Sequence, residues 1–243
     1  MSIEDQWRVI KMTIDPILHK RILIRILKDI YSESTIGPIL GFKGGTAANL
    51  FYDLDRFSVD LDFDLLDNSR TDRLFDQVNE LLKKHGILKR VDKKRNCFVY
   101  ILDYSEKVPG SQNVKVEINL RCFGSKYAIL SYLGIPMKVM ERDDMAANKM
   151  VAFYERIGKT NRDIYDTWFF LVNNWPINQK LIEQRMNMPY REFLEKCCEQ
   201  LENMNNKTIL AGMGEVLSDK QKIWVKNMLK KDLIFQLQLL LAS

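Results

Sequence analysis

The sequence of 243 residues is poor in the side chains on which many enzymes and metal sites depend. Its two histidines, His19 and His85, lie far apart along the chain, which argues against a histidine-based metal site and against a histidine general base. The four cysteines form no C-x-x-C pair, and two of them, Cys197 and Cys198, are adjacent. We therefore expect reduced, buried thiols and neither a zinc site nor a disulfide framework.

Long apolar runs are also missing. No stretch approaches the roughly 20 apolar residues that a membrane span needs, and residues 1–5 include two acidic groups where a signal peptide would be basic and then apolar. We expect a cytoplasmic protein without a membrane anchor. The 37 Lys and Arg residues exceed the 32 Asp and Glu residues by five, and this mild basic excess permits an anionic partner without requiring one.

The pattern of apolar residues changes character near residue 140. Strand signals are confined to the first part, and helical periodicity dominates the rest. This predicts an α+β domain with a mixed sheet over 1–140, followed by an all-helical domain over 141–243. The predicted strands cover 39–42, 59–65, 87–92, 97–104 and 113–120. The predicted helices cover 5–30 (with a break at Pro16), 46–51, 70–85, 143–157, 162–173, 178–186, 190–202 and 219–241.

One strand carries acidic residues in strict alternation. Ser58, Asp60, Asp62 and Asp64 share one face of the predicted strand, and the apolar residues between them share the other. No basic residue occurs on this face within two positions of Asp60 or Asp62, so we expect a cation to relieve the repulsion between the carboxylates. Mg²⁺ is the favoured candidate, because it takes oxygen ligands and is often held by one or two carboxylates plus substrate phosphates. A plain solvent-facing acidic strand is the alternative.

A glycine turn precedes this strand. Gly44 and Gly45 would let the backbone approach a phosphate closely, and Thr46 is a candidate N-cap of the helix that follows. A simple strand-to-helix turn is the alternative. The turn is not a Walker A loop, because G-x-x-x-x-G-K-[ST] is absent and Lys43 comes before the glycines.

A later carboxylate, Glu117, lies within a short apolar run. It would complete a trio of acids if its strand lay beside that of Asp60 and Asp62. An outward-facing glutamate is the alternative reading, and Asp64 is the competing third acid.

These features in this order resemble the nucleotidyltransferase superfamily with the DNA polymerase β type of fold. Its pattern is a glycine pair, then D-x-D about a dozen residues later, then a carboxylate on a neighbouring strand. Lys43 to Thr46, followed by Arg56 to Phe63, resembles more narrowly the AbiEii-type nucleotidyltransferase toxins. That family also carries K-x-x-A and then R-D-x-x-D in its helical half. Here these motifs are Lys149 to Ala152 and Arg162 to Asp166.

The resemblance implies a role for each matched residue. Residues Lys43, Gly44, Gly45, Thr46 and Ser58 would bind the nucleotide. Asp60 and Asp62, with Glu117, would hold Mg²⁺, and Lys149 would clamp the triphosphate. Asp163 and Asp166 would act as a general base or orient Lys149. Without the resemblance, Lys149 would be a lysine reaching the surface, and Arg162 with Asp166 would be a surface ion pair.

The resemblance also implies an NTP as substrate, the 3′ end of tRNA as acceptor, and a separately encoded antitoxin as partner. Two basic clusters would support an RNA acceptor, although a solvated loop is the alternative for the first. They comprise Lys89, Arg90, Lys93, Lys94 and Arg95, and Lys220, Lys222, Lys226, Lys230 and Lys231. A small-molecule or protein acceptor and a non-catalytic RNA- or nucleotide-binding module remain open as other functions.

Overall fold

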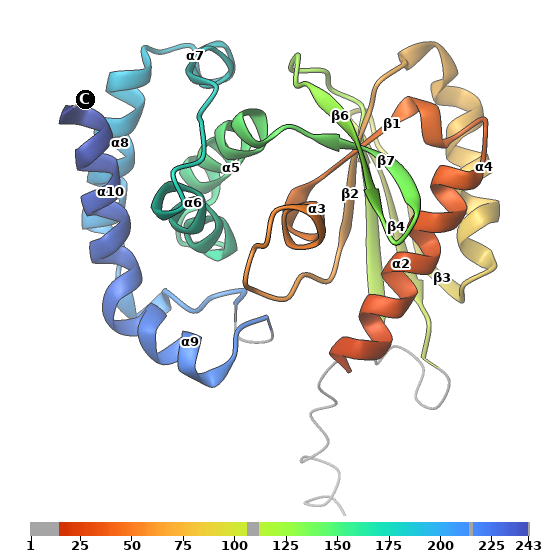
Figure 1. Cartoon of the computed structure of the whole chain (residues 1–243), viewed down its shortest axis with the longest axis horizontal. Helices are drawn as coiled ribbons and strands as arrows, with labels where there is room; N and C mark the ends of the chain where they lie inside the picture. The colour runs from red at the N-terminus through yellow and green to blue at the C-terminus, as the bar shows by residue number, and fades with distance from the viewer. Residues whose placement is uncertain (1–14, 106–111, 214–215, 243) are drawn as a thin grey trace, which may run out of the picture.

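A mixed β-sheet and a group of helices make up the protein. The computed structural model describes residues 15–105, 112–213 and 216–242 (Figure 1). Within these ranges seven strands form one sheet in the order β3-β4-β5-β2-β1-β7-β6. The strands are β1 (Leu40–Lys43), β2 (Leu61–Leu65), β3 (Ile87–Lys93), β4 (Cys97–Asp103), β5 (Asn113–Asn119), β6 (Tyr127–Tyr132) and β7 (Ile135–Met140).

The central strands are short and pair in both directions. β2 runs antiparallel to β1, with Lys43 opposite Asp62. On its other side β2 runs parallel to β5, with Glu117 opposite Asp62. Because neighbouring residues at one register point to the same face of a sheet, this pairing brings the predicted acids of two strands together.

Two helices cover the apolar face of the sheet, α2 (Pro16–Ser32) and α4 (Thr71–Lys83), which lie side by side in Figure 1. Pro16 does not break a helix as predicted but begins one, in the first-turn position where its missing N–H costs nothing. Asp15 caps this helix through its carboxylate. The predicted portion over 5–14 lies outside the described residues.

Helix α3 (Gly44–Phe51) begins directly at the glycine pair. The predicted N-cap role of Thr46 is wrong, because the cap position is Lys43, which makes no side-chain capping bond. Thr46 is buried instead, and its hydroxyl donates to the backbone carbonyl of Asp60 at 2.5 Å. It therefore ties the start of α3 to the start of the acidic strand.

The predicted helices of the second half are all present. They are α5 (Arg142–Arg156), α6 (Arg162–Val172), α7 (Gln179–Met186), α8 (Tyr190–Asn203), α9 (Asp219–Trp224) and α10 (Lys230–Ala242), with a π-helical stretch, Val225–Leu229, joining the last two. Short 3-10 turns are at Gly37–Ile39, Asn68–Arg70 and Asn206–Thr208. None of the described helices is both long and apolar enough to cross a membrane.

Strands β6 and β7 were not predicted. They form a hairpin closed by Leu133 and Gly134, both with positive φ, as a tight two-residue turn requires. β6 is an edge strand, and Ile129 in its middle is 73% exposed. An edge strand with mixed burial lacks the clean alternation on which the sequence prediction depended.

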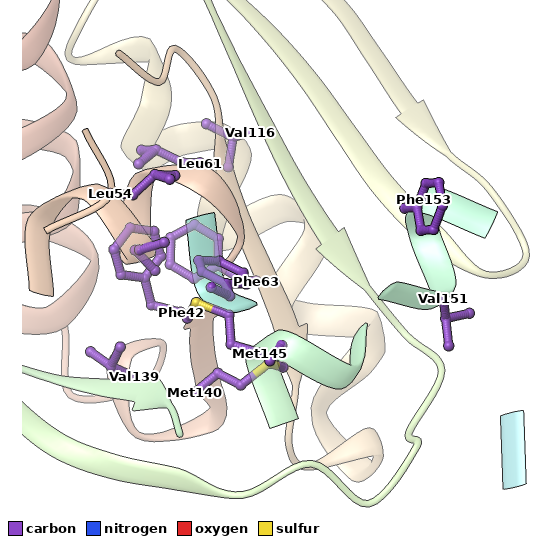
Figure 2. Packing of buried hydrophobic residues seen from close by; sticks show 14 of the residues in the cluster. Phe42, Leu54, Leu61, Phe63, Val116, Val139, Met140, Met145, Val151 and Phe153 are labelled. Atoms are coloured by element: carbon purple, nitrogen blue, oxygen red, sulfur yellow. The ribbon is translucent and has the colours of Figure 1, made fainter. Parts of the chain in front are cut away.

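One hydrophobic core runs from the sheet into the helices. Phe42 and Phe63 pack against each other in the sheet, with ring centroids 5.3 Å apart. Figure 2 shows Met140, at the end of β7, and Met145, on α5, close to this pair. The predicted domain boundary at 140 coincides with the change from strand to helix, and its role as a boundary between two domains stays a prediction.

Candidate active site

The acidic strand faces a cavity of about 380 Å³ between the sheet and the helices. Asp60 and Asp62 both line it, together with Gly44, Gly45 and Lys149. Burial, followed by the negative charge of Asp62, raises the pKa of Asp60 above its usual value. The cavity therefore holds two carboxylates that are close enough to repel each other.

Glu117 and Asp64 differ in what surrounds them. Glu117 lies beside Asp62 on the adjacent strand and lines the cavity. The carboxylate of Asp64 is occupied by protein partners, because it accepts bonds from Lys43 at 2.5 Å, Asn119 at 2.9 Å and the hydroxyl of Tyr127 at 2.5 Å. Of the two candidate third acids, Glu117 is therefore the one that lines the cavity, where Lys115 donates to it at 3.1 Å.

Two cations reach the acids from other elements. The ammonium of Lys115 is 3.1 Å from Glu117 and 3.9 Å from Asp62, and the guanidinium of Arg162 is 3.7 Å from Asp60. We expected no basic residue beside Asp60 and Asp62 on their own strand, and that is correct for the strand, but β5 and α6 each bring a basic side chain close to them. Lys115 precedes Glu117 by two residues and so shares its face of β5, a signal that the sequence contained but that was not used.

The glycine turn is fixed by close contact with the acids. Gly44 has a φ of +80°, which glycine adopts without strain, and a Cβ there would lie 2.4 Å from a carboxylate oxygen of Asp62. A Cβ on Gly45 would lie 2.7 Å from the guanidinium of Arg56 and 2.8 Å from the hydroxyl of Ser58. Both glycines are thus required by their surroundings.

Lys149 forms the opposite side of the cavity. Its ammonium is 2.9 Å from Asp163 and 2.7 Å from Asp166, and only 15% of the side chain is exposed. The alternative of a lysine reaching the surface is therefore wrong. Burial alone would lower the pKa of Lys149, but attraction to Asp163 and Asp166 outweighs burial and raises it, so the group is charged.

Asp166 is the centre of this charge network. It accepts two hydrogen bonds from Arg56, at 2.5 and 2.7 Å, in addition to its contact with Lys149. Burial would raise the pKa of Asp166, but the charges of Arg56 and Lys149 prevail and lower it to about 2. The alternative of a surface pair with Arg162 is wrong, because Asp166 is fully buried and Arg162 turns to Asp60.

Arg56 was not among the predicted site residues. It lies in the loop before the acidic strand, and nothing in its spacing marks it as a partner of a residue 110 positions later. Its burial beside Gly45 and Ser58 links the glycine turn to the Lys149 network. The predicted residues from the two halves of the chain are therefore brought together by a residue that the sequence analysis missed.

A further group of cavity residues was also missed. Arg121 and Arg185 lie over the ring of Phe123, with guanidinium carbons 5.4 and 4.5 Å from its centroid. The nearest carboxylate partner of Arg185 is Glu155, at 4.0 Å. This end of the cavity is positively charged and suits an anionic ligand.

Oxygen ligands for a metal ion are present but few. Across the described residues, no group of three or more His, Cys, Asp or Glu side chains is arranged to hold a metal ion. Asp60 and Asp62 alone fit Mg²⁺ as it is commonly bound, with two carboxylates and the remaining ligands from substrate phosphates and water.

The two predicted basic clusters differ in how many of their side chains are exposed. The first is a hairpin turn between β3 and β4, as predicted, where Lys94 and Arg95 are exposed. In the second, Lys230 donates to the backbone carbonyls of Glu202 and Met204 and so caps the end of α8. Lys226 and Lys231 are exposed.

Comparison with solved structures shows the same fold in two bacterial proteins. JHP933 from Helicobacter pylori has a TM-score of 0.62 and 18% identity, over 96% of this chain and 94% of that one. MenT4, a nucleotidyltransferase toxin from Mycobacterium tuberculosis, has a TM-score of 0.59 and 20% identity, over 91% of this chain and 84% of that one. Comparison with curated protein sequences found no match.

The family model of the AbiEii toxin, described as a nucleotidyl transferase of a type IV toxin–antitoxin system, matches residues 25–222. That range contains the glycine turn, the D-x-D strand, Lys149 and the R-D-x-x-D motif, and it covers most of the chain. The chain therefore belongs to the AbiEii family of nucleotidyltransferase toxins.

Proposed function

We propose that this protein transfers a nucleoside monophosphate from an NTP to the 3′ end of tRNA, with Mg²⁺ held by Asp60 and Asp62. The observation that carries the proposal is that the D-x-D carboxylates, the glycine turn and the buried ammonium of Lys149 line one cavity. The site of action would be the cytoplasm, where both substrates are found. A cognate antitoxin would counteract the activity, as the family description implies.

The triphosphate would lie between the glycine turn and Lys149. At Gly44 and Gly45 the backbone N–H groups that begin α3 have no intrahelical partner, and the positive end of the helix favours an anion. Thr46 and Ser58 hold this turn against the acidic strand, their hydroxyl oxygens 3.0 Å apart. Lys43 is engaged by Asp64, so its role would be to position the turn.

The metal site would consist of Asp60 and Asp62, with Glu117 beside them. When bound, Mg²⁺ would lower the pKa of the attacking hydroxyl and stabilise charge on the phosphates. The protein's own contribution is to hold both carboxylates at one side of the cavity while Lys149 meets phosphate oxygens from the other. Attack on the α-phosphate would release pyrophosphate.

Of the two roles considered for Asp163 and Asp166, orientation of Lys149 is the better supported. Each carboxylate is engaged by two cations, Asp166 by Arg56 and Lys149, and Asp163 by Lys149 and Arg156. A carboxylate whose pKa is lowered to about 2 is a weak proton acceptor at neutral pH. Asp166 would therefore fix the ammonium of Lys149.

A tRNA acceptor requires positive surface outside the cavity, and the exposed residues Lys94, Arg95, Lys226 and Lys231 would supply part of it. Each phosphate that the protein neutralises releases counterions, so binding should weaken steeply as salt rises. A small acceptor held only in the cavity would show far weaker salt dependence.

Incubation of the purified protein with each labelled NTP and total tRNA tests the proposal. We expect label on the tRNA with the wild type and none with Asp60→Ala, which should retain its fold. Full activity in an Asp60→Ala, Asp62→Ala double variant would exclude the mechanism. Label on a small molecule or protein, with tRNA unlabelled, would reject the acceptor while retaining the transferase. Nucleotide binding without pyrophosphate release, whatever the acceptor, would indicate a non-catalytic module.

A further inference from the structure

Lys115 is a cavity residue whose ammonium lies directly among the acids proposed to hold the metal. Its nitrogen is 3.1 Å from a carboxylate oxygen of Glu117 and 3.9 Å from one of Asp62. About a third of its side chain is exposed, so it lies at the wall of the cavity. Neither the family motifs nor the proposed function assigns it a role.

The position of Lys115 is fixed by the sheet. On β5, Val114 and Val116 are fully buried on one face, so Lys115 and Glu117 must share the other. The parallel pairing that sets Glu117 opposite Asp62 brings Lys115 level with the start of the acidic strand. On this face, the ammonium of Lys115 lies within ion-pair distance of Glu117 and Asp62.

The charges around Lys115 are unequal in number. Asp60, Asp62 and Glu117 supply three negative charges, whereas Lys115 and Arg162 supply two positive ones. One uncompensated negative charge is a weak attraction for a free divalent cation, which must also approach an ammonium. A metal bound to a triphosphate carries excess negative charge, which the same ammonium attracts.

We propose that Lys115 is a built-in counter-cation of the acid cluster, so that the cluster takes up a divalent metal only together with a triphosphate. This inference rests on the proposed function, because it assumes that the cavity binds an NTP. Lys115 would thus be a positioning residue. It keeps the carboxylates compensated in the empty enzyme and turns to the phosphates when the metal complex enters.

Metal binding can be measured without turnover by the water proton relaxation of Mn²⁺, which changes when the ion binds to protein. The full chain is titrated with Mn²⁺ alone and with Mn²⁺ plus inorganic tripolyphosphate, which mimics the NTP tail whatever the base. We expect the wild type to bind Mn²⁺ alone weakly and to bind it much more tightly with tripolyphosphate. Lys115→Met should bind Mn²⁺ alone roughly tenfold more tightly or better, because a nearby like charge is gone.

Two variants control the result. Lys115→Arg keeps the charge and should behave as the wild type does, and adding Asp62→Asn to Lys115→Met should abolish the gained affinity. Equal affinity of wild type and Lys115→Met for Mn²⁺ alone, or a gain that survives Asp62→Asn, would overturn the inference and leave the transferase assignment standing. Absence of Mn²⁺ binding in every form, even with tripolyphosphate, would overturn the inference and the proposed metal site together.

Discussion

Arg56 and Asp166, 110 residues apart, are joined by two charge-assisted hydrogen bonds of 2.5 and 2.7 Å. Both side chains are buried, 2% and 0% exposed. Planar, bidentate pairing of this kind is among the stronger polar contacts in proteins and fixes direction as well as distance. It fastens the loop that precedes the acidic strand to helix α6.

Loss of this carboxylate should destabilise the fold. Asp166→Asn would leave the guanidinium of Arg56 and the ammonium of Lys149 buried without their shared counter-charge, at a cost of about 3–5 kcal/mol. Urea unfolding measures this. Asp219→Asn is the matched control, because Asp219 pairs with Lys222 but is 95% exposed, and its loss should cost at most ~1 kcal/mol. Similar effects of the two substitutions would contradict the assigned role of the buried pair.

The same residue predicts a pH dependence. The pKa of Asp166 is lowered to about 2 in the folded state, below the 3.8 of an ordinary aspartate. A lowered folded-state pKa gives stability that is fully present above the unfolded value and is lost as pH falls through the folded value. The contribution of Asp166, roughly 2 kcal/mol, should therefore fade between about pH 4 and pH 2. The unfolding free energies of wild type and Asp166→Asn should therefore approach each other by roughly 2 kcal/mol over this range, and a constant difference would be evidence against the shift.

Alanine substitutions at Gly44 and Gly134 can be compared directly. Both have φ near +80°, but a Cβ at Gly44 meets Asp62 at 2.4 Å, whereas nothing lies within 4 Å of one at Gly134. Each Gly→Ala substitution should cost roughly 1 kcal/mol through backbone strain. Only Gly44→Ala should also abolish nucleotide transfer, because it displaces the carboxylate that is proposed to hold the metal. Transfer assays and thermal unfolding of both variants separate strain from displacement.

Asp60 should be a residue that costs stability. Its pKa is raised by burial and by Asp62, so folding makes its ionised form less favourable than it is in the unfolded chain. Asp60→Asn removes that unfavourable charge while keeping the shape, so the melting temperature should stay the same or rise. Transfer should fall by at least about 100-fold. A marked drop in melting temperature would show that Asp60 supports the fold and not only the chemistry.

Lys149 should act on the triphosphate and not on the base. Lys149→Met keeps the length of the side chain but removes its charge, and it leaves Asp163 and Asp166 with their arginine partners. Affinity for NTP, measured by calorimetry, should fall by tenfold or more, which corresponds to about 1.4 kcal/mol. Affinity for the corresponding nucleoside should not change. An equal loss for nucleoside and NTP would indicate a collapsed cavity.

Much of the site could be predicted from the sequence because its residues lie in regular patterns. The alternation of Asp60, Asp62 and Asp64 with buried apolar residues is visible along one strand, and it survives in the structure. The pattern could not show which of these carboxylates forms hydrogen bonds and ion pairs with other protein groups. Asp64 pairs with the ammonium of Lys43 and accepts hydrogen bonds from Asn119 and Tyr127 on two other strands. These partners are set by the order of the strands in the sheet.

Two features that the sequence analysis did not predict correctly are the start of helix α3 and the basic residues beside the acids. Thr46 resembles an N-cap in sequence, but the helix begins two residues earlier and the hydroxyl of Thr46 donates to the carbonyl of Asp60 instead. Lys115 lies on β5 and Arg162 on α6, so they come close to Asp62 and Asp60 only when the sheet and the helices have assembled. The sequence therefore indicates which side chains line the cavity, but the charges that surround each of them depend on contacts between residues far apart in the chain.

The contact between Arg56 and Asp166 also has a consequence during synthesis. A growing chain that has emerged only as far as α5 contains the glycine turn, the carboxylates and Lys149, yet it lacks both Asp163 and Asp166. In that state neither Arg56 nor Lys149 has the carboxylate that holds it in place. The cavity therefore cannot reach the arrangement described above before helix α6 has been synthesised, however early its glycine turn and its carboxylates emerge.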